Sequence, residues 1–247
     1  MKLWEQPVIA ERLVRDAEER RQKRQPRAPG IHASDLLYCL RQRWLTRKYG
    51  LGGKEPDTLS TDTLTLFLTG HAFHALLEEG QTEVETQLVL PFGQSITCTI
   101  DYLVPPDITP WEVKSTRYSS AKTPEDIAQY IDQLGTYCLA RRSLRGYLVI
   151  LHLNGDYREN RKPILKVWEL NFTADELAGW AIELQRRHDI LVDESHIPDE
   201  DYEHYQWECK YCPYGPEGTL ECPSGIGRMT PYFLVDDDME PLEVVEL

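Results

Sequence analysis

The run Gly146-Tyr147-Leu148-Val149-Ile150-Leu151-His152-Leu153 is almost continuously apolar. Strands with one face in water alternate apolar and polar residues, whereas a continuous apolar run indicates a strand buried on both faces. A helix is predicted before this run, because Thr123-Pro124-Glu125-Asp126 places a proline and two acids in a first turn. That helix reaches about Arg142. The run is therefore predicted to be a central strand of a sheet.

Neighbouring segments supply the other elements of this sheet. Strands are expected at residues 84–92, 95–104, 110–116 and 163–171, and helices at residues 5–25, 34–49, 61–80 and 173–192. Ser34 is predicted to cap the second helix, and Thr173-Ala174-Asp175-Glu176 resembles a capping box. The order of elements predicts an α/β fold: a mixed β-sheet flanked by helices, with a helical N-terminal region and an irregular, cysteine-bearing C-terminal segment.

Charge is distributed unevenly along the chain, whose net charge is −14. Residues 1–49 hold twelve Lys and Arg against six Asp and Glu, whereas residues 193–247 hold two against fifteen. A basic N-terminal face thus remains on an acidic protein, and residues 231–247 are expected to form an acidic, solvated or partner-binding tail. The sequence shows neither a secretory signal nor an apolar run long enough to span a membrane, so a cytoplasmic location is expected.

Asp101, Glu112 and Lys114 lie in two strand-like runs that a proline-rich link joins. The two strands can form a hairpin, and the period of two places Glu112 and Lys114 on one face. Two carboxylates can then share a hard cation such as Mg²⁺ or Mn²⁺, with an ammonium group beside it. That arrangement suits phosphodiester hydrolysis. The alternative interpretation is a cross-strand ion pair on a solvated face.

Six cysteines divide into two groups. Cys98 and Cys138 lie in apolar segments and are interpreted as small core residues. The others are predicted to hold one metal centre: Cys39, Cys209, Cys212 and Cys222. Four thiolates suit zinc or an iron–sulphur cluster, and a single remote fourth ligand favours the cluster. The alternative is a set of unrelated thiols.

The motifs together resemble a PD-(D/E)XK nuclease of the RecB exonuclease type. The resemblance is closest to the iron–sulphur branch that includes the CRISPR-associated exonuclease, the fourth Cas protein, and the nuclease domain of AddB. Six short motifs follow in the family's order: Cys39 with Arg41 to Trp44, Gly70-x-x-x-His74, Ile100-Asp101, Glu112-Val113-Lys114, Gln133-x-x-x-Tyr137, and the terminal cysteines. The glycine that often precedes the metal-binding Asp is absent. The resemblance implies one nuclease domain over residues 1–230 that includes a 4Fe–4S module.

The resemblance also implies roles for these residues. His74 and the Val113 carbonyl would join Asp101 and Glu112 as metal ligands, with His71 as the competing histidine. Lys114 would orient the attacking water or stabilise charge on the phosphate. Gln133 and Tyr137, one helical turn apart, would support the active site or the DNA strand; a buried Tyr with a Gln neighbour is the alternative.

Basic residues interleave with aromatic rings near Cys39. Arg41, Arg43, Arg47 and Lys48 accompany Trp44 and Tyr49. Such a pattern favours single-stranded DNA, with phosphates held by charge and bases stacked on rings. An ordinary amphipathic helix with a solvated basic face is the alternative.

Three functions compete on this basis. The first is a metal-dependent DNA exonuclease acting on single strands or ends, with a structural 4Fe–4S cluster. The second is a non-catalytic subunit that binds DNA ends or protein partners in a CRISPR-adaptation or recombination complex, although the intact Asp101, Glu112 and Lys114 argue against it. The third is a zinc-stabilised endonuclease. The colour of the purified protein distinguishes iron from zinc.

Overall fold

The computed structural model describes residues 29–49, 80–104, 106–117, 119–120, 128–155, 162–198, 208–209, 212, 214, 232–233 and 243–246. Its helices and strands are α2 (Ala33–Leu37), α3 (Leu40–Tyr49), β1 (Gln81–Val89), β2 (Ser95–Leu103), β3 (Pro110–Thr116), α5 (Ala128–Arg141), β4 (Arg145–His152), β5 (Ile164–Asn171), α6 (Ala174–Val192) and β6 (Glu243–Glu246). The helices predicted at residues 5–25 and 61–80 lie outside the described residues. None of the described helices is both long and apolar enough to cross a membrane.

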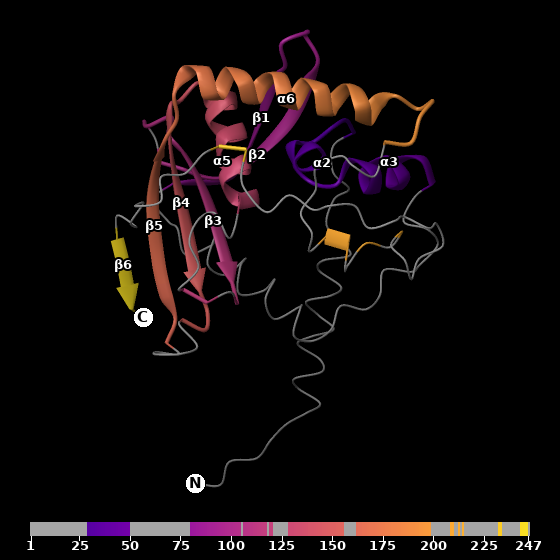
Figure 1. The fold of residues 1–247 in the computed structure, drawn as a ribbon. Coiled ribbons are helices and arrows are strands. Elements are labelled where there is room, and N and C mark those ends of the chain that lie inside the picture. Colours follow the sequence, from indigo (N-terminus) through magenta and orange to yellow (C-terminus); the bar gives the residue numbers. More distant parts are fainter. Residues whose placement is uncertain are drawn as a thin grey trace, which may run out of the picture.

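The strands form one six-stranded mixed sheet in the order β1-β2-β3-β4-β5-β6 (Figure 1). Only β3 and β4 are parallel among these neighbours, and the chain between them contains α5. The other neighbouring pairs are antiparallel. The prediction of a mixed α/β sheet is confirmed. The apolar run before Leu153 forms β4, which has a strand paired on each side.

Helix α5 packs on the face of the sheet that carries the main core. Leu148 and Ile150 of β4 are fully buried together with Ile131 and Leu134 of α5. Helix α6 runs across α5 and also contacts α2 and α3 (Figure 1). Since successive side chains of a strand alternate in direction, Val149 belongs to a second, smaller cluster on the opposite side.

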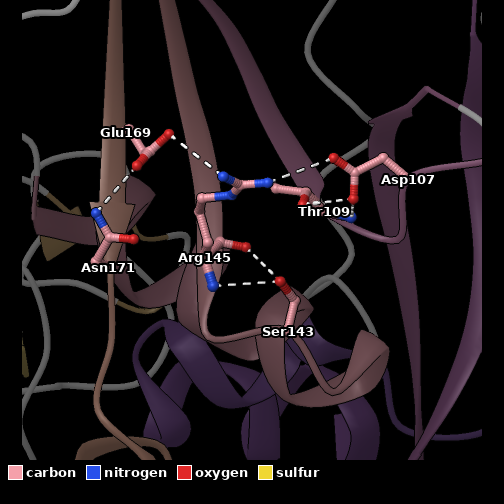
Figure 2. Close-up of polar contacts among 6 residues, drawn as sticks. All are labelled: Asp107, Thr109, Ser143, Arg145, Glu169 and Asn171. Carbon is pink, nitrogen blue, oxygen red and sulfur yellow. Dashed lines mark hydrogen bonds and ion pairs between the residues drawn. The ribbon is translucent and has the colours of Figure 1, made fainter.

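A polar cluster holds the β2–β3 connection against β4 and β5 (Figure 2). Asp107 accepts hydrogen bonds from the Thr109 amide and hydroxyl, which lower the pKa of the Asp107 carboxyl. Arg145 at the start of β4 lies 3.6 Å from an Asp107 oxygen and 3.9 Å from a Glu169 oxygen. These groups are about half exposed or less, so each pair contributes only a fraction of about 1 kcal/mol. The cluster lies where the connection enters β3 (Figure 2).

The single helix predicted at residues 34–49 is wrong, because the chain breaks at Tyr38. Tyr38 is extended, with φ −103° and ψ −170°, and separates α2 from α3. The N-cap of α2 is His32 rather than Ser34. The cause of the break is distant in sequence: Arg187 donates hydrogen bonds to the carbonyls of Leu36 and Tyr38, which α2 leaves without helical partners.

The first hairpin is displaced from its prediction. β1 ends at Val89 rather than at residue 92, since Pro91 has no amide to extend the ladder. The Leu90 amide donates to the Gln94 carbonyl across the turn at 2.7 Å, and Gly93 adopts φ 92°. Glycine suits this left-handed conformation.

Parts of the predicted acidic tail belong to the folded domain, in contrast to the expected solvated extension. Residues Glu243–Glu246 pair with β5 as the edge strand β6. Phe233 is 3% exposed and lies 4.7 Å from the Phe172 ring. A Cβ at Gly135 in α5 would lie 2.3 Å from the Phe233 ring, so glycine provides the space for it. Burial of this aromatic ring stabilises the docking of its segment on the core.

Candidate active site

Asp101 and Glu112 meet where β2 and β3 separate. Their ladder holds only two residue pairs, Tyr102 with Trp111 and Leu103 with Pro110. Beyond these pairs, the backbone amide of Val113 in β3 donates to the Asp101 side chain, at 3.0 Å from Oδ2, and not to a backbone carbonyl of β2. The predicted hairpin is thus present, and its opening creates the space for the site.

The partner strand β1 is distorted at the same level. The β1–β2 register includes Thr82 with Tyr102 and Val84 with Ile100, but the intervening pair is absent from the ladder. Glu83, which lies opposite Asp101, has φ 52°. A non-glycine residue in this left-handed region carries backbone strain, which is frequent at functional sites. The sequence contains no glycine or proline there to reveal it.

Lys114 bridges the two carboxylates. Its Nζ lies 2.7 Å from Asp101 Oδ2 and 2.5 Å from Glu112 Oε1. Burial lowers the pKa of Lys114, but the charges of Glu112 and Asp101 outweigh it and hold that pKa well above its usual value. Lys114 is therefore an ammonium group, able to donate hydrogen bonds and not to act as a base.

Glu112 is the most unusual group of the site. Its side chain is completely buried, and neither oxygen accepts a well-directed hydrogen bond, although Lys114 is close in charge contact. Burial and the neighbouring Asp101 raise the pKa of Glu112 well above its usual value, against the effect of Lys114. Buried carboxylates without hydrogen bonds are costly unless a cation compensates them. The donor set therefore fits a hard divalent cation held by Asp101 and Glu112.

Helix α5 presents the predicted pair to this site. Gln133 Nε2 donates to the Tyr137 hydroxyl at 2.6 Å. Burial raises the pKa of Tyr137 well above its usual value, and the charges of Glu112 and Asp101 add to this effect. Tyr137 thus lies within the electrostatic field of the carboxylates and remains protonated. The fold brings Gln133 and Tyr137 to the same place as the carboxylates.

Two further tyrosines at the site were missed. The Tyr130 ring centroid lies 6.0 Å from Lys114 Nζ. Tyr130 is two helical turns before Tyr137 on α5, so the helical period of Gln133 and Tyr137 was the signal that could have identified it. Tyr38, at the break between α2 and α3, also experiences the charges of Lys114 and Glu112. No local pattern identified Tyr38, because the break depends on distant residues.

Basic residues on α3 have different surroundings from those predicted. Trp44 is 3% exposed, and its indole donates to the Asp193 carbonyl at 2.7 Å. Its ring packs α3 against the end of α6 and is not available for base stacking in this conformation. Arg41 donates to the Pro198 carbonyl at 3.1 Å, and the Arg43 guanidinium lies over the Tyr38 ring at 5.7 Å.

An open pocket of about 510 Å³ adjoins the exposed part of α3. Its lining comes from α3, α6 and the chain that follows α6: Trp44, Arg47, Lys48, Leu191, Val192 and Glu194. Tyr49, beside it on α3, is 56% exposed. The exposed cationic and aromatic groups of α3 therefore lie at its C-terminal end.

The cysteines separate as the sequence suggested. Cys98 and Cys138 are fully buried in the main core, and burial raises the pKa of each thiol to about 12. Cys39 caps α3, since its Sγ accepts the Gln42 amide at 3.5 Å. Its own amide donates to Glu208, the residue before Cys209, at 3.0 Å.

Cys209 and Cys212 lie in one turn, in which the Cys212 amide donates to the Cys209 carbonyl at 3.4 Å. Cys222 lies outside the described residues, as do His71 and His74. Within the part of the chain that is described, no three His, Cys, Asp or Glu side chains converge as the ligands of an ion. The metal cluster that joins the N- and C-terminal segments thus stays a prediction.

A family model of the PD-(D/E)XK nuclease superfamily matches residues 10–216. The match covers most of the chain, so the protein belongs to the PD-(D/E)XK nuclease superfamily. Its members are nucleases and usually use Mg²⁺ or Mn²⁺, which agrees with the carboxylate pair. The superfamily predicted from the motifs is confirmed, whereas the RecB-like and iron–sulphur branch stays a prediction.

Solved structures share the fold. One described as "Crystal structure of SSO0001" superposes with a TM-score of 0.58, covering 83% of this chain and 94% of that chain at 19% identity. At this identity the likeness concerns the fold alone. No curated protein matches the sequence.

Proposed function

We propose that the protein is a divalent-metal-dependent DNA exonuclease that acts on single strands or DNA ends. The observation that carries the proposal is the fully buried Glu112 carboxylate, which accepts no well-directed hydrogen bond and adjoins Asp101 and Lys114. A structural ion pair would be expected to satisfy its buried oxygens. Here Lys114 is in charge contact with Oε1, and a divalent cation would take its place beside both carboxylates.

The residues then have distinct roles. Asp101 and Glu112 would hold the Mg²⁺ or Mn²⁺, together with the Val113 carbonyl and His74, or His71 in its place. When bound, the ion polarises the scissile phosphate and lowers the pKa of a water. Lys114, kept protonated by the carboxylates, donates to the phosphate or orients the water. Gln133 and Tyr137 position the strand beside Lys114.

Binding of a single strand is supported by the charge of α3. Arg47 and Lys48 are exposed at the end of α3. The Arg43 guanidinium lies over the ring of Tyr38. The charges of the active site act in turn on the Tyr38 side chain. A strand bound along this helix would place its phosphates beside guanidinium groups and reach Lys114 past Tyr38. Arg41 and Trp44 would hold α3 in place through their contacts with the segment after α6.

The test is digestion of linear and circular single-stranded DNA of the same sequence. The protein with Mn²⁺ is expected to shorten end-labelled linear DNA and to leave the circle intact, because an exonuclease requires an end. EDTA should stop the reaction, and added Mn²⁺ or Mg²⁺ should restore it. Cleavage of the circle would favour an endonuclease, and undiminished cleavage in EDTA would remove the metal from the reaction.

A 4Fe–4S cluster held by Cys39, Cys209, Cys212 and Cys222 is the second part of the proposal. Its support is the contact of the Cys39 amide with Glu208, the residue before Cys209, which brings the Cys39 and Cys209 segments together. We also propose that the protein is cytoplasmic and acts with proteins of CRISPR adaptation or recombination. The genes that neighbour its own gene would test this.

Single Cys→Ala variants of all six cysteines should separate into two groups. Variants of the four ligand cysteines are expected to lose iron and thermal stability, because the cluster links distant segments. Cys98→Ala and Cys138→Ala should retain iron and cost about 1 kcal/mol of stability, as small buried side chains do. Iron and zinc are measured per chain in protein prepared without oxygen. Zinc without iron in the wild type would mean that the four cysteines form a zinc site. Iron retained in Cys39→Ala would mean that the fourth ligand is another residue.

A further inference from the structure

The side chains of β2 change face between Ile100 and Tyr102. Cys98 and Ile100 both belong to the main core, as the period of two requires. Tyr102 is two residues further along but belongs to the smaller cluster on the opposite face, and Leu103 belongs to the main core again. Side chains two residues apart in a regular strand share one face, so the alternation in β2 shifts by one residue within this segment.

The shift determines the direction in which Asp101 points. Glu112 and Lys114 flank Val113, which belongs to the smaller cluster, so their side chains point to the face of the main core. The Asp101 carboxylate lies 2.7 Å from Lys114 Nζ and is therefore on that face as well. Continued alternation from Ile100 would instead point Asp101 to the opposite face, away from the other two catalytic groups.

Strand β1 makes the same shift at Glu83. Residues directly opposite each other on antiparallel strands point to one face. Val84 is opposite Ile100 and Thr82 is opposite Tyr102, so β1 must change face between these two residues when β2 does. Glu83 is the residue between them, and its φ of 52° is left-handed. Local irregularities of this kind in a strand turn side chains to a new direction and are frequent beside active sites.

We propose that Glu83 is a positioning residue whose left-handed backbone directs Asp101 into the active site. The inference rests on the proposed metal-dependent nuclease function. The two strands require the backbone conformation of Glu83 and not its carboxylate. A positive φ is unfavourable for a residue that has a Cβ, and most unfavourable for a β-branched one. Substitutions at this position should therefore rank by their tolerance of positive φ, with glycine best, alanine next and valine worst.

Thermal stability and Mn²⁺ affinity of Glu83→Gly, Glu83→Ala and Glu83→Val test this ranking. Glu83→Gly and Glu83→Ala both lack the carboxylate, so the difference between them reports the backbone alone. The Tm of Glu83→Gly should exceed that of Glu83→Ala by roughly 2–8 °C. In calorimetric titrations, Glu83→Gly should bind Mn²⁺ within about threefold of the wild type, whereas Glu83→Val should bind it about 10–100-fold more weakly, as when a metal ligand loses its support.

Glu85, two residues further along β1, provides the matched control. It is exposed and pairs with Thr99 in the regular part of the ladder. Valine is favoured over glycine in a regular strand. Glu85→Val should therefore be at least as stable as Glu85→Gly, which is the reverse of the order expected at Glu83, and both should keep the Mn²⁺ affinity of the wild type. The same order of valine and glycine at both positions would overturn the inference.

Hydrogen exchange measured by NMR tests the direction of Asp101 without metal or DNA. The Val113 amide donates to Asp101 Oδ2 at 3.0 Å, so it should lose protection when Asp101 turns away. Its exchange rate, relative to that of the Leu148 amide in β4, should be about tenfold or more higher in Glu83→Val than in Glu83→Gly. An equal ratio in the two variants would overturn the inference.

Two outcomes need separate readings. If Glu83→Val does not fold, Glu83→Ala replaces it in the exchange measurement, with a smaller rise of the ratio expected over Glu83→Gly and an unchanged ratio again overturning the inference. If the wild type neither binds Mn²⁺ nor cleaves DNA, the proposed function fails, and the exchange of the Val113 amide still decides whether Glu83 directs Asp101.

Discussion

Replacing Glu112 with glutamine is expected to lower nuclease activity by at least about a thousandfold while the fold is retained. The amide keeps the shape of the side chain but removes the negative charge that would hold the metal, and about 4 kcal/mol of transition-state stabilisation corresponds to this factor. Initial rates on end-labelled single-stranded DNA with Mn²⁺ measure the effect. Circular dichroism confirms folding.

Lys114→Ala should reduce the same rate by about a hundredfold or more, the loss expected when one donor to developing charge is removed. Glu169→Gln is the control for both variants, because Glu169 lies on β5 of the same sheet in a partly exposed ion pair with Arg145. Its rate should equal that of the wild type. Wild-type activity in either active-site variant would contradict the assignment of the site.

The second large effect concerns stability in the absence of metal. Burial raises the pKa of Glu112 above its value in the unfolded chain, so ionisation of this group opposes folding. The cost is absent below the unfolded pKa and is fully present once the pH exceeds the folded pKa. Metal-free Glu112→Gln should therefore be more stable than the wild type at high pH, and the difference should vanish in acid.

Leaving a buried polar group without hydrogen bonds costs about 1–3 kcal/mol, which the variant avoids. The variant also loses the attraction between Glu112 and Lys114, so the net gain in its free energy of unfolding is smaller than this cost. In a domain of this size that corresponds to a rise in Tm of roughly 2–10 °C. Added Mn²⁺ should raise the Tm of the wild type and leave that of the variant unchanged, because only the wild type binds it. Thermal unfolding at two pH values, with and without Mn²⁺, provides the test. A variant that is less stable at high pH, or that responds equally to Mn²⁺, would contradict the account.

The residues that could be placed together from the sequence depend on short-range patterns. Asp101, Glu112 and Lys114 lie on adjacent strands of one hairpin, and the strand period decides which face they share. Gln133 and Tyr137 are one turn apart on one helix. Cys98 and Cys138 lie in apolar surroundings of their own segments. In each case neighbours within about fifteen residues determine the environment, so the pattern is visible in the chain.

The features that the sequence did not predict depend on distant partners. Arg187 ends α2 from a position 149 residues beyond Tyr38, and Glu208 holds Cys39 across 169 residues. The burial of Trp44 depends on the Asp193 carbonyl at the end of α6. Phe233 enters the core because Gly135 leaves space for it. Local propensity favoured a continuous helix, an exposed ring and a solvated tail, and tertiary contacts overrode each of them.

The central claim is that Asp101 and Glu112 form a divalent-metal site for phosphodiester hydrolysis. Diffraction from crystals soaked in Mn²⁺, recorded for anomalous scattering by manganese, tests it most directly. The account predicts a peak in contact with both carboxylates in the wild type, with Lys114 displaced from Glu112, and no peak there in Glu112→Gln. A manganese peak only at another place would contradict it. Absence of manganese between Asp101 and Glu112 in the wild type, with Lys114 still in contact with Glu112, would contradict it as well.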